Sequence, residues 1–148
     1  ATNFTDIKNI VTEIRYISSA LDVKNPSLYF TNNSFLKDNA DIIARFGRLE
    51  RVGEVESGRG LHLTTTKHNC WLDIDLHTAK VYVTKLRVAK EEKRALIERL
   101  QQRLQNKAYT QKAPKAVVQQ TKDLMLHEEE LLKKLEAELT TFETLSQS

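Results

Sequence analysis

The apolar positions of residues 86–145 follow the spacing of two long amphipathic helices. In the first helix they step by three and four residues, with one charged exception. The predicted seam of that helix is Leu86, Ala89, Lys93, Leu96 and Leu100. The seam of the second helix is Val117, Thr121, Leu124, Glu128, Leu131, Leu135, Glu138, Phe142 and Leu145. A second row, which widens this stripe as several packing partners would require, is Val118, Met125, Leu132 and Leu139.

A polar break at residues 106–114 separates the two helices. Asn106 is predicted to cap the first helix, and Pro114 to begin the second, because a proline in a first turn loses no hydrogen bond. The helices would then be roughly 30 Å and nearly 50 Å long, at about 1.5 Å per residue. The pattern predicts an antiparallel helical hairpin, a coiled-coil arm.

Upstream, apolar residues at helical spacing predict a helix over residues 3–22 that ends before Asn25-Pro26. Its apolar stripe would be Phe4, Ile7, Ile10, Val11, Ile14, Ile17 and Leu21. Alternating or β-rich segments predict strands at 27–31, 48–56, 61–66 and 70–76, with a bulge at Gly53.

A helix over residues 35–46, capped by Asn33 or Ser34, would cover this sheet with an inward face that includes Leu36, Ile43 and Phe46. Residues 79–84 are ambiguous, and a strand is favoured over an early start of the arm. The predicted fold class is α+β, an N-terminal helix and a small α/β module followed by a long antiparallel helical hairpin. The predicted domains are 1–25, 26–84 and 85–148.

Charge changes this picture, because the net charge of +3 is unevenly distributed. Residues 1–84 carry ten basic and ten acidic side chains. Residues 85–122 carry eleven basic and three acidic ones, a net of +8, and residues 123–148 carry two and seven, a net of −5. A solvated helical face normally mixes both signs, so this concentration favours a polyanionic partner.

The search for other chemistry is negative. His62, His68 and Cys70 have no zinc-ligand spacing, and surface histidines are the preferred interpretation. Asp73 and Asp75 are expected on the solvent side of a strand rather than as a catalytic pair. No phosphate loop, nucleophile motif, membrane span or signal peptide is recognisable. A single cysteine favours a reducing, cytoplasmic compartment.

The tip motif Asn106-x-x-Tyr109-x-x-Lys112-Ala113-Pro114-x-x-Val117-Val118 resembles the C-terminal coiled-coil arm of bacterial-type valyl-tRNA synthetases. In that family the pattern is Asn-x-x-Phe-x-x-Lys/Arg-Ala-Pro-x-x-Val-Val. The run Phe4-x-x-Ile7-x-x-Ile10-Val11-x-x-Ile14-Arg15 is similar to the last helix of the family's anticodon-binding bundle. The α/β segment then occupies the place of the small domain before the arm.

Three positions depart from the family pattern. Tyr109 replaces the usual Phe, Thr121 stands where an acidic residue is common, and Ser18 stands where a second Arg is frequent. The class I signatures His-Ile-Gly-His and Lys-Met-Ser-Lys-Ser are absent, so no catalytic site is expected in this chain, and ATP would be used by a missing catalytic domain. No metal or cofactor is predicted.

The resemblance implies an arm that binds tRNA at its D-loop/T-loop elbow, and the basic residues suit recognition of RNA by shape. The predicted RNA-binding residues are Lys90, Lys93, Arg94, Arg99, Arg103, Lys107, Tyr109, Lys112, Lys115 and Lys122. Tyr109 would either stack on a base or close the hairpin tip against Leu104 and Val117.

Three functions remain open. The first is the C-terminal region of a valyl-tRNA synthetase that assists aminoacylation by clamping tRNA, monomeric or part of a larger synthetase chain. The second is a free-standing relative that binds tRNA or ribosomal RNA. The third is a protein–protein coiled-coil adaptor, which would not need a basic tip.

Overall fold

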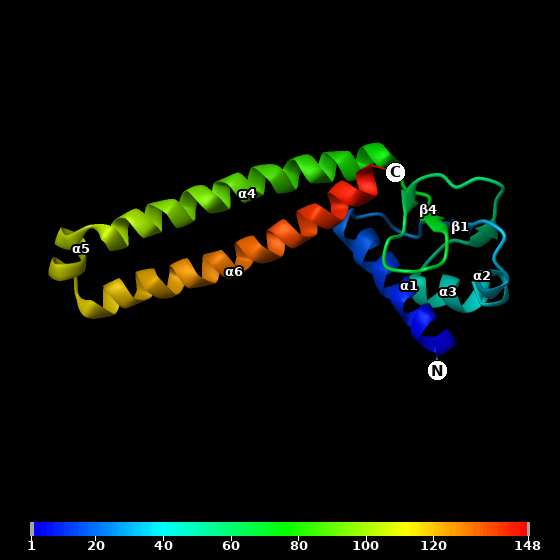
Figure 1. The fold of residues 1–148 in the computed structure, drawn as a ribbon, viewed down its shortest axis with the longest axis horizontal. Coiled ribbons are helices and arrows are strands. Elements are labelled where there is room, and N and C mark those ends of the chain that lie inside the picture. Colours follow the sequence, from blue (N-terminus) through cyan, green and yellow to red (C-terminus); the bar gives the residue numbers. More distant parts are fainter. Residues whose placement is uncertain (1, 148) are drawn as a thin grey trace. The chain divides into compact units, whose positions relative to one another are not determined.

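The computed structural model describes residues 2–147, and its architecture is the predicted α+β arrangement (Figure 1). The chain forms two compact units. One comprises the described residues up to Tyr82 together with those from Phe142 onward, and the other comprises Val83–Thr141. The described residues of the predicted segment 1–25 and residues 26–82 thus lie in one unit, whereas the second unit contains most of the helical hairpin. None of the described helices is long and apolar enough to cross a membrane.

The first unit begins with α1 (Thr2–Ala20), which confirms the predicted N-terminal helix. Its buried stripe is Ile10, Ile14 and Ile17, spaced by four and three residues. Phe4 was expected in this stripe but is exposed, because it lies more than one turn before the first buried position.

A four-stranded mixed sheet packs at the centre of this unit, in the order β2-β1-β4-β3. Its strands are β1 (Leu28–Phe30), β2 (Val52–Glu54), β3 (Leu61–His62) and β4 (Cys70–Leu72). β1 pairs in parallel with β2 and antiparallel with β4. The strands are shorter than predicted, and Gly53 makes no bulge, because it lies in regular register opposite Tyr29.

The predicted helix over residues 35–46 is two helices, α2 (Ser34–Asp38) and α3 (Ala40–Gly47). Asn33 caps α2 as expected, since its side chain accepts a hydrogen bond from the Leu36 amide. Asn39 interrupts the helix, and its side chain donates back to the Phe35 carbonyl. Leu36 and Ile43 are buried, but Phe46 is 57% exposed and does not belong to the inward face.

The hairpin begins earlier than expected, with α4 (Leu76–Gln105). Residues 79–84 are therefore helical, and the favoured strand was wrong. The Asp75 carboxylate accepts a hydrogen bond from the His77 amide at the helix start, as an N-cap does. Ala79 and Val83 are both buried, which extends a helical spacing of four and three residues to Leu86.

The polar break contains a short helix of its own, α5 (Lys107–Lys112), before α6 (Lys115–Ser146) begins after Pro114. Asn106 lies at the end of α4, where its amide donates to the carbonyls of Gln102 and Arg103. It also caps α5, because its side chain accepts a hydrogen bond from the Ala108 amide. α4 and α6 run in opposite directions on either side of α5, which confirms the antiparallel hairpin (Figure 1).

Most of the predicted α6 seam is buried or half-buried, namely Thr121, Glu128, Leu131, Leu135, Glu138, Phe142 and Leu145. Val117 and Leu124 are 41% and 44% exposed, whereas the row that was expected only to widen the stripe is buried or half-buried. This inward row repeats every seven residues and consists of Val118, Met125, Leu132 and Leu139. On α4, Leu86, Lys93 and Leu100 lie inward with the same repeat.

Candidate nucleic-acid interface

The hairpin unit divides into two halves of different charge. We define the distal half as residues 95–127, which include the turn, and the proximal half as residues 83–94 and 128–141. The distal half contains six Lys/Arg and two Asp/Glu residues, a net charge of +4. The proximal half contains seven of each and is neutral. All of the net positive charge of this unit therefore lies in the half that contains the turn.

Ion pairs between α4 and α6 occupy three of the seven proximal cations. Lys93 is half-buried in the seam and forms an ion pair and hydrogen bond with Glu128. Glu136 faces Lys90 at 3.8 Å and Arg94 at 3.4 Å. Three of the predicted RNA-binding residues, Lys90, Lys93 and Arg94, are thus engaged within the protein.

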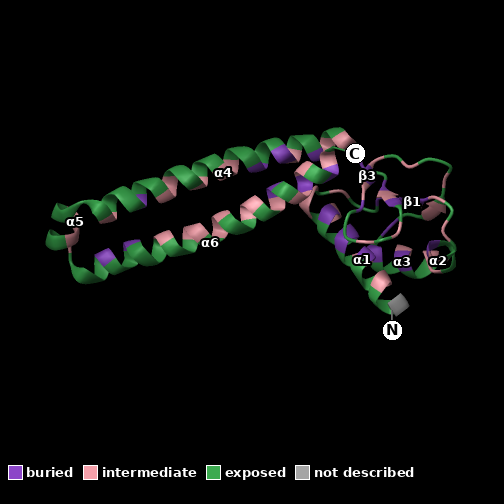
Figure 2. Cartoon of the chain, in the orientation of Figure 1, coloured by how far each residue is buried: buried purple, intermediate pink, exposed green. Residues whose placement is uncertain are grey.

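The distal cations differ in both exposure and pairing. All six are exposed, and no acidic side chain of the described residues lies within ion-pair distance of them. They are Arg99, Arg103, Lys107, Lys112, Lys115 and Lys122. Figure 2 shows that the surface of both helices and of α5 is largely exposed around the turn. These side chains can approach phosphate groups without breaking an ion pair inside the protein.

Tyr109 connects α5 to α6 across the turn. Its hydroxyl lies 2.7 Å from the Thr121 hydroxyl, which itself donates to the Val117 carbonyl at 3.2 Å. Because the Thr121 proton is used in that way, the Tyr109 hydroxyl is the donor between the two. The ring is half-buried, with the Arg103 guanidinium 5.9 Å from its centre. This geometry supports the closure of the hairpin tip rather than a free stacking platform.

The same hydrogen bond joins two of the departures from the resemblance noted above. Tyr109 adds a hydroxyl to the expected Phe, and Thr121 supplies its acceptor in place of an acidic residue. Thr121 is buried in the seam, where an unpaired hydroxyl would be costly. The sequence shows both departures, but only the structure brings them together.

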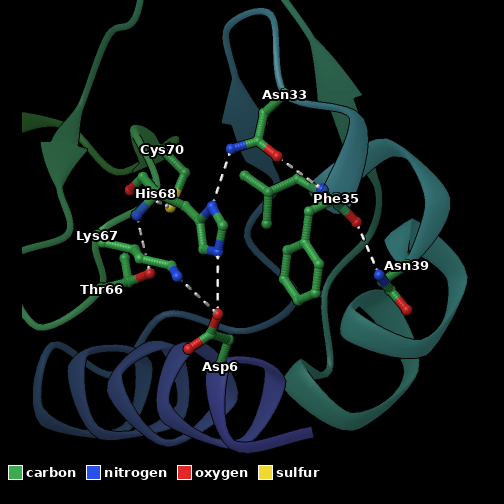
Figure 3. A network of polar contacts seen from close by, with 9 residues as sticks. Asp6, Asn33, Phe35, Asn39, Thr66, Lys67, His68 and Cys70 are labelled. Carbon is green, nitrogen blue, oxygen red and sulfur yellow. Dashed lines mark hydrogen bonds and ion pairs between the residues drawn. The ribbon is translucent and has the colours of Figure 1, made fainter. Parts of the chain in front are cut away.

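His68 and Cys70 of the first unit belong to a network of polar contacts within the fold (Figure 3). The Asn33 side-chain oxygen accepts a hydrogen bond from the Leu36 amide. The Asn33 NH₂ group therefore lies toward His68 Nδ1, 3.0 Å away. His68 Nδ1 must therefore accept, and Nε2 carries the proton toward Asp6, 3.4 Å away. The imidazole stacks on Phe35 with ring centres 4.6 Å apart. Both ring nitrogens are used inside the fold.

Cys70, Asp73 and Asp75 also have structural surroundings that account for them. Burial, with a contribution from Glu13, raises the pKa of the Cys70 thiol to about 12, so thiolate is scarce at neutral pH. Asp73 lies 3.9 Å from Arg59, and Asp75 caps α4. In the part of the chain that the structure describes, no group of three or more His, Cys, Asp or Glu side chains is arranged to hold a metal ion.

One buried contact was missed by the sequence reasoning. Glu13 of α1 is buried and accepts hydrogen bonds from the amides and hydroxyls of both Thr64 and Thr65, at 2.7–3.2 Å. These contacts fix the segment between β3 and β4 on α1. No local motif signals them, because the partners are more than fifty residues apart.

Comparison with known proteins agrees with the hairpin geometry. Residues 84–143 match the family model described as the valyl tRNA synthetase tRNA binding arm. This segment comprises nearly all of the hairpin unit, including both halves and the turn. No curated protein gives a significant match to the chain. Residues 84–143 are therefore a tRNA-binding arm of the valyl-tRNA synthetase family, as the tip motif predicted.

Proposed function

We propose that the distal half of the hairpin clamps the elbow of a tRNA and thereby assists aminoacylation by a valyl-tRNA synthetase. The single observation that carries this proposal is the separation of charge along the hairpin. Three of the seven proximal cations are paired with α6 and the proximal half is neutral as a whole, whereas the six distal cations are exposed and have no ion-pair partner among the described residues. A surface of this kind is suited to the phosphates of a folded RNA.

The contact would consist mainly of phosphate recognition. Arg99 and Arg103 lie one helical turn apart on α4, and Lys107 and Lys112 lie on α5 beyond them. Side chains at such spacing can follow a phosphate backbone, but they carry little information about base identity. The arm would therefore recognise the shape of the elbow, and amino-acid specificity would lie in a catalytic domain elsewhere.

The elbow itself can be tested by RNA competition. Intact tRNA should bind the full chain at least about tenfold more tightly than an acceptor-stem minihelix of equal charge per nucleotide, because the minihelix lacks the D-loop/T-loop corner. Equal affinities for tRNA and the minihelix would contradict binding at the elbow. Tighter binding to ribosomal RNA fragments than to tRNA would favour the free-standing alternative instead.

A distal variant tests which half binds. The three substitutions are Arg99→Gln, Lys107→Gln and Lys112→Gln, and among the described residues these charges have no ion-pair partner. This variant should lose at least about tenfold in tRNA affinity at low salt, because each phosphate contact contributes separately to the salt-dependent binding.

A proximal variant is the matched control, since it removes the same charge from the same unit. Its substitutions are Lys85→Gln, Lys133→Gln and Lys134→Gln, all at exposed positions. We expect less than a threefold loss of affinity. Equal losses in the two variants would mean that only the total charge matters, and the proposal would fail. The adaptor alternative predicts no loss in either variant.

A further inference from the structure

A second basic site lies in the first unit, at the C-terminal end of α1. An open pocket of about 750 Å³ is lined there by the last turns of α1, residues 22–26, and the end of α3 at Gly47 and Arg48. Figure 1 shows α1 and α3 as neighbours in this unit. The pocket is separate from the polar network of His68 and from the hairpin residues discussed above.

Three cations surround this pocket, and one carboxylate accompanies them. The cations are Arg15, Lys24 and Arg48, and the carboxylate is Asp22. All four side chains are exposed, and no ion pair of the described residues involves any of them. The pocket therefore has a net positive lining that is not neutralised within the protein, as an anion site requires.

Neutral polar groups complete the lining. Thr12, Ser19 and Asn25 add polar side chains to this lining. Cations together with hydroxyl and amide groups suit a phosphate and its attached sugar, and the volume is in the range of pockets that hold a small ligand.

Arg48 has a backbone conformation that favours glycine. It is the C-cap of α3, with φ 55° and ψ 48°, in the left-handed region. An arginine there is less favourable than glycine, because its Cβ crowds the backbone. A non-glycine residue in this conformation is consistent with a use for the side chain, and Arg48 is one of the residues that line the pocket.

We propose that this pocket binds one phosphate–ribose unit of the RNA that the distal half of the hairpin binds. RNA is preferred over a free small phosphate because the pocket is open and its cations are exposed, whereas small-ligand sites usually enclose most of their ligand. The choice of RNA rests on the proposed function, but the pocket residues and the distal cations lie in different units and can be changed separately.

The decisive variant is Arg48→Gly in the full chain. It removes the guanidinium while placing the preferred residue in the left-handed conformation, so the melting temperature should stay unchanged or rise. The affinity for tRNA should fall about fivefold or more, and the salt dependence, as the slope of log K against log salt, should decrease by about one. The matched control is Arg45→Gln, an exposed cation on the same helix that does not line the pocket, and it should change affinity less than twofold.

A second variant, Arg15→Gln with Lys24→Gln, should lower tRNA affinity further without altering the backbone. If Arg48→Gly binds tRNA as tightly as Arg45→Gln does, the pocket proposal is overturned, whatever the distal variant does. If Arg48→Gly loses affinity and the distal variant does not, the proposed function fails and the pocket proposal stands.

AMP and inorganic phosphate serve as probes of the alternative ligand, a free small phosphate compound. Binding of either that Arg48→Gly abolishes, with unchanged tRNA affinity, would assign the pocket to a small phosphate compound and overturn the RNA proposal.

Discussion

The two halves of the hairpin use the same kinds of residues for different purposes. In the proximal half, Lys90, Lys93 and Arg94 are held by Glu128 and Glu136 across the two helices. In the distal half, six exposed cations have only Glu98 and Asp123 as acidic neighbours in sequence, and Asp123 accepts a hydrogen bond from Gln119. In the proposed function, the positions of the acidic residues on the facing helix, rather than the number of basic residues, decide which half binds RNA.

Both halves nevertheless depend on the same apolar seam, and the largest expected effect concerns its packing. Leu100 is 4% exposed, so Leu100→Ala should lower the free energy of unfolding by about 2–4 kcal/mol. The exposed Leu126→Ala is the control and should change it by less than about 0.5 kcal/mol. Urea denaturation followed by circular dichroism measures both. Equal effects would mean that the seam does not hold the distal half in place.

Substitutions in the Lys93–Glu128 ion pair can destabilise the proximal half without changing the distal cations. Its side chains are 25% and 13% exposed, so Glu128→Ala leaves a poorly hydrated cation in the seam and should cost about 1–3 kcal/mol. The double variant Lys93→Met with Glu128→Leu should recover most of that loss, because apolar residues can replace a buried ion pair. Chemical denaturation gives the comparison. A double variant as unstable as Glu128→Ala would contradict this assignment.

The tip provides a smaller effect. Tyr109→Phe removes only the hydroxyl that donates to Thr121, and we expect a loss of about 0.5–1.5 kcal/mol in unfolding free energy with unchanged tRNA affinity. Tyr109→Ala separates the two roles further. A lower melting temperature supports tip closure, whereas weaker RNA binding at an unchanged melting temperature would show that the ring stacks on a base.

The regular parts of this fold were predictable because their signals are local. Leucine spacing and Pro114 were sufficient for the hairpin, and the tip motif was sufficient for the family. Most of the seam was also predictable, including Lys93 and Glu128, which pair with each other across the helices. The exposure of Val117 and Leu124 was not. Residues 79–84 were misassigned, since Val81, Tyr82 and Val83 have strand composition although the Asp75 cap starts a helix before them.

The candidate site was predictable only as a list of charges. The sequence places ten residues on the arm, but pairing across helices divides them, and that pairing depends on contacts between residues about 35 to 45 positions apart. The pocket at Arg48 could not be predicted at all. It requires the end of α3 to lie beside α1, and the contacts between these helices join residues far apart in the chain.

The most direct test of the separation of charge is the salt dependence of tRNA affinity for the distal and proximal variants. Both remove three positive charges from the same unit, so general electrostatic attraction to RNA falls by the same amount. We predict that the slope of log K against log salt decreases by about two to three for the distal variant, as the loss of three phosphate contacts requires, and by less than about one for the proximal variant. Equal slopes for the two variants would contradict the account.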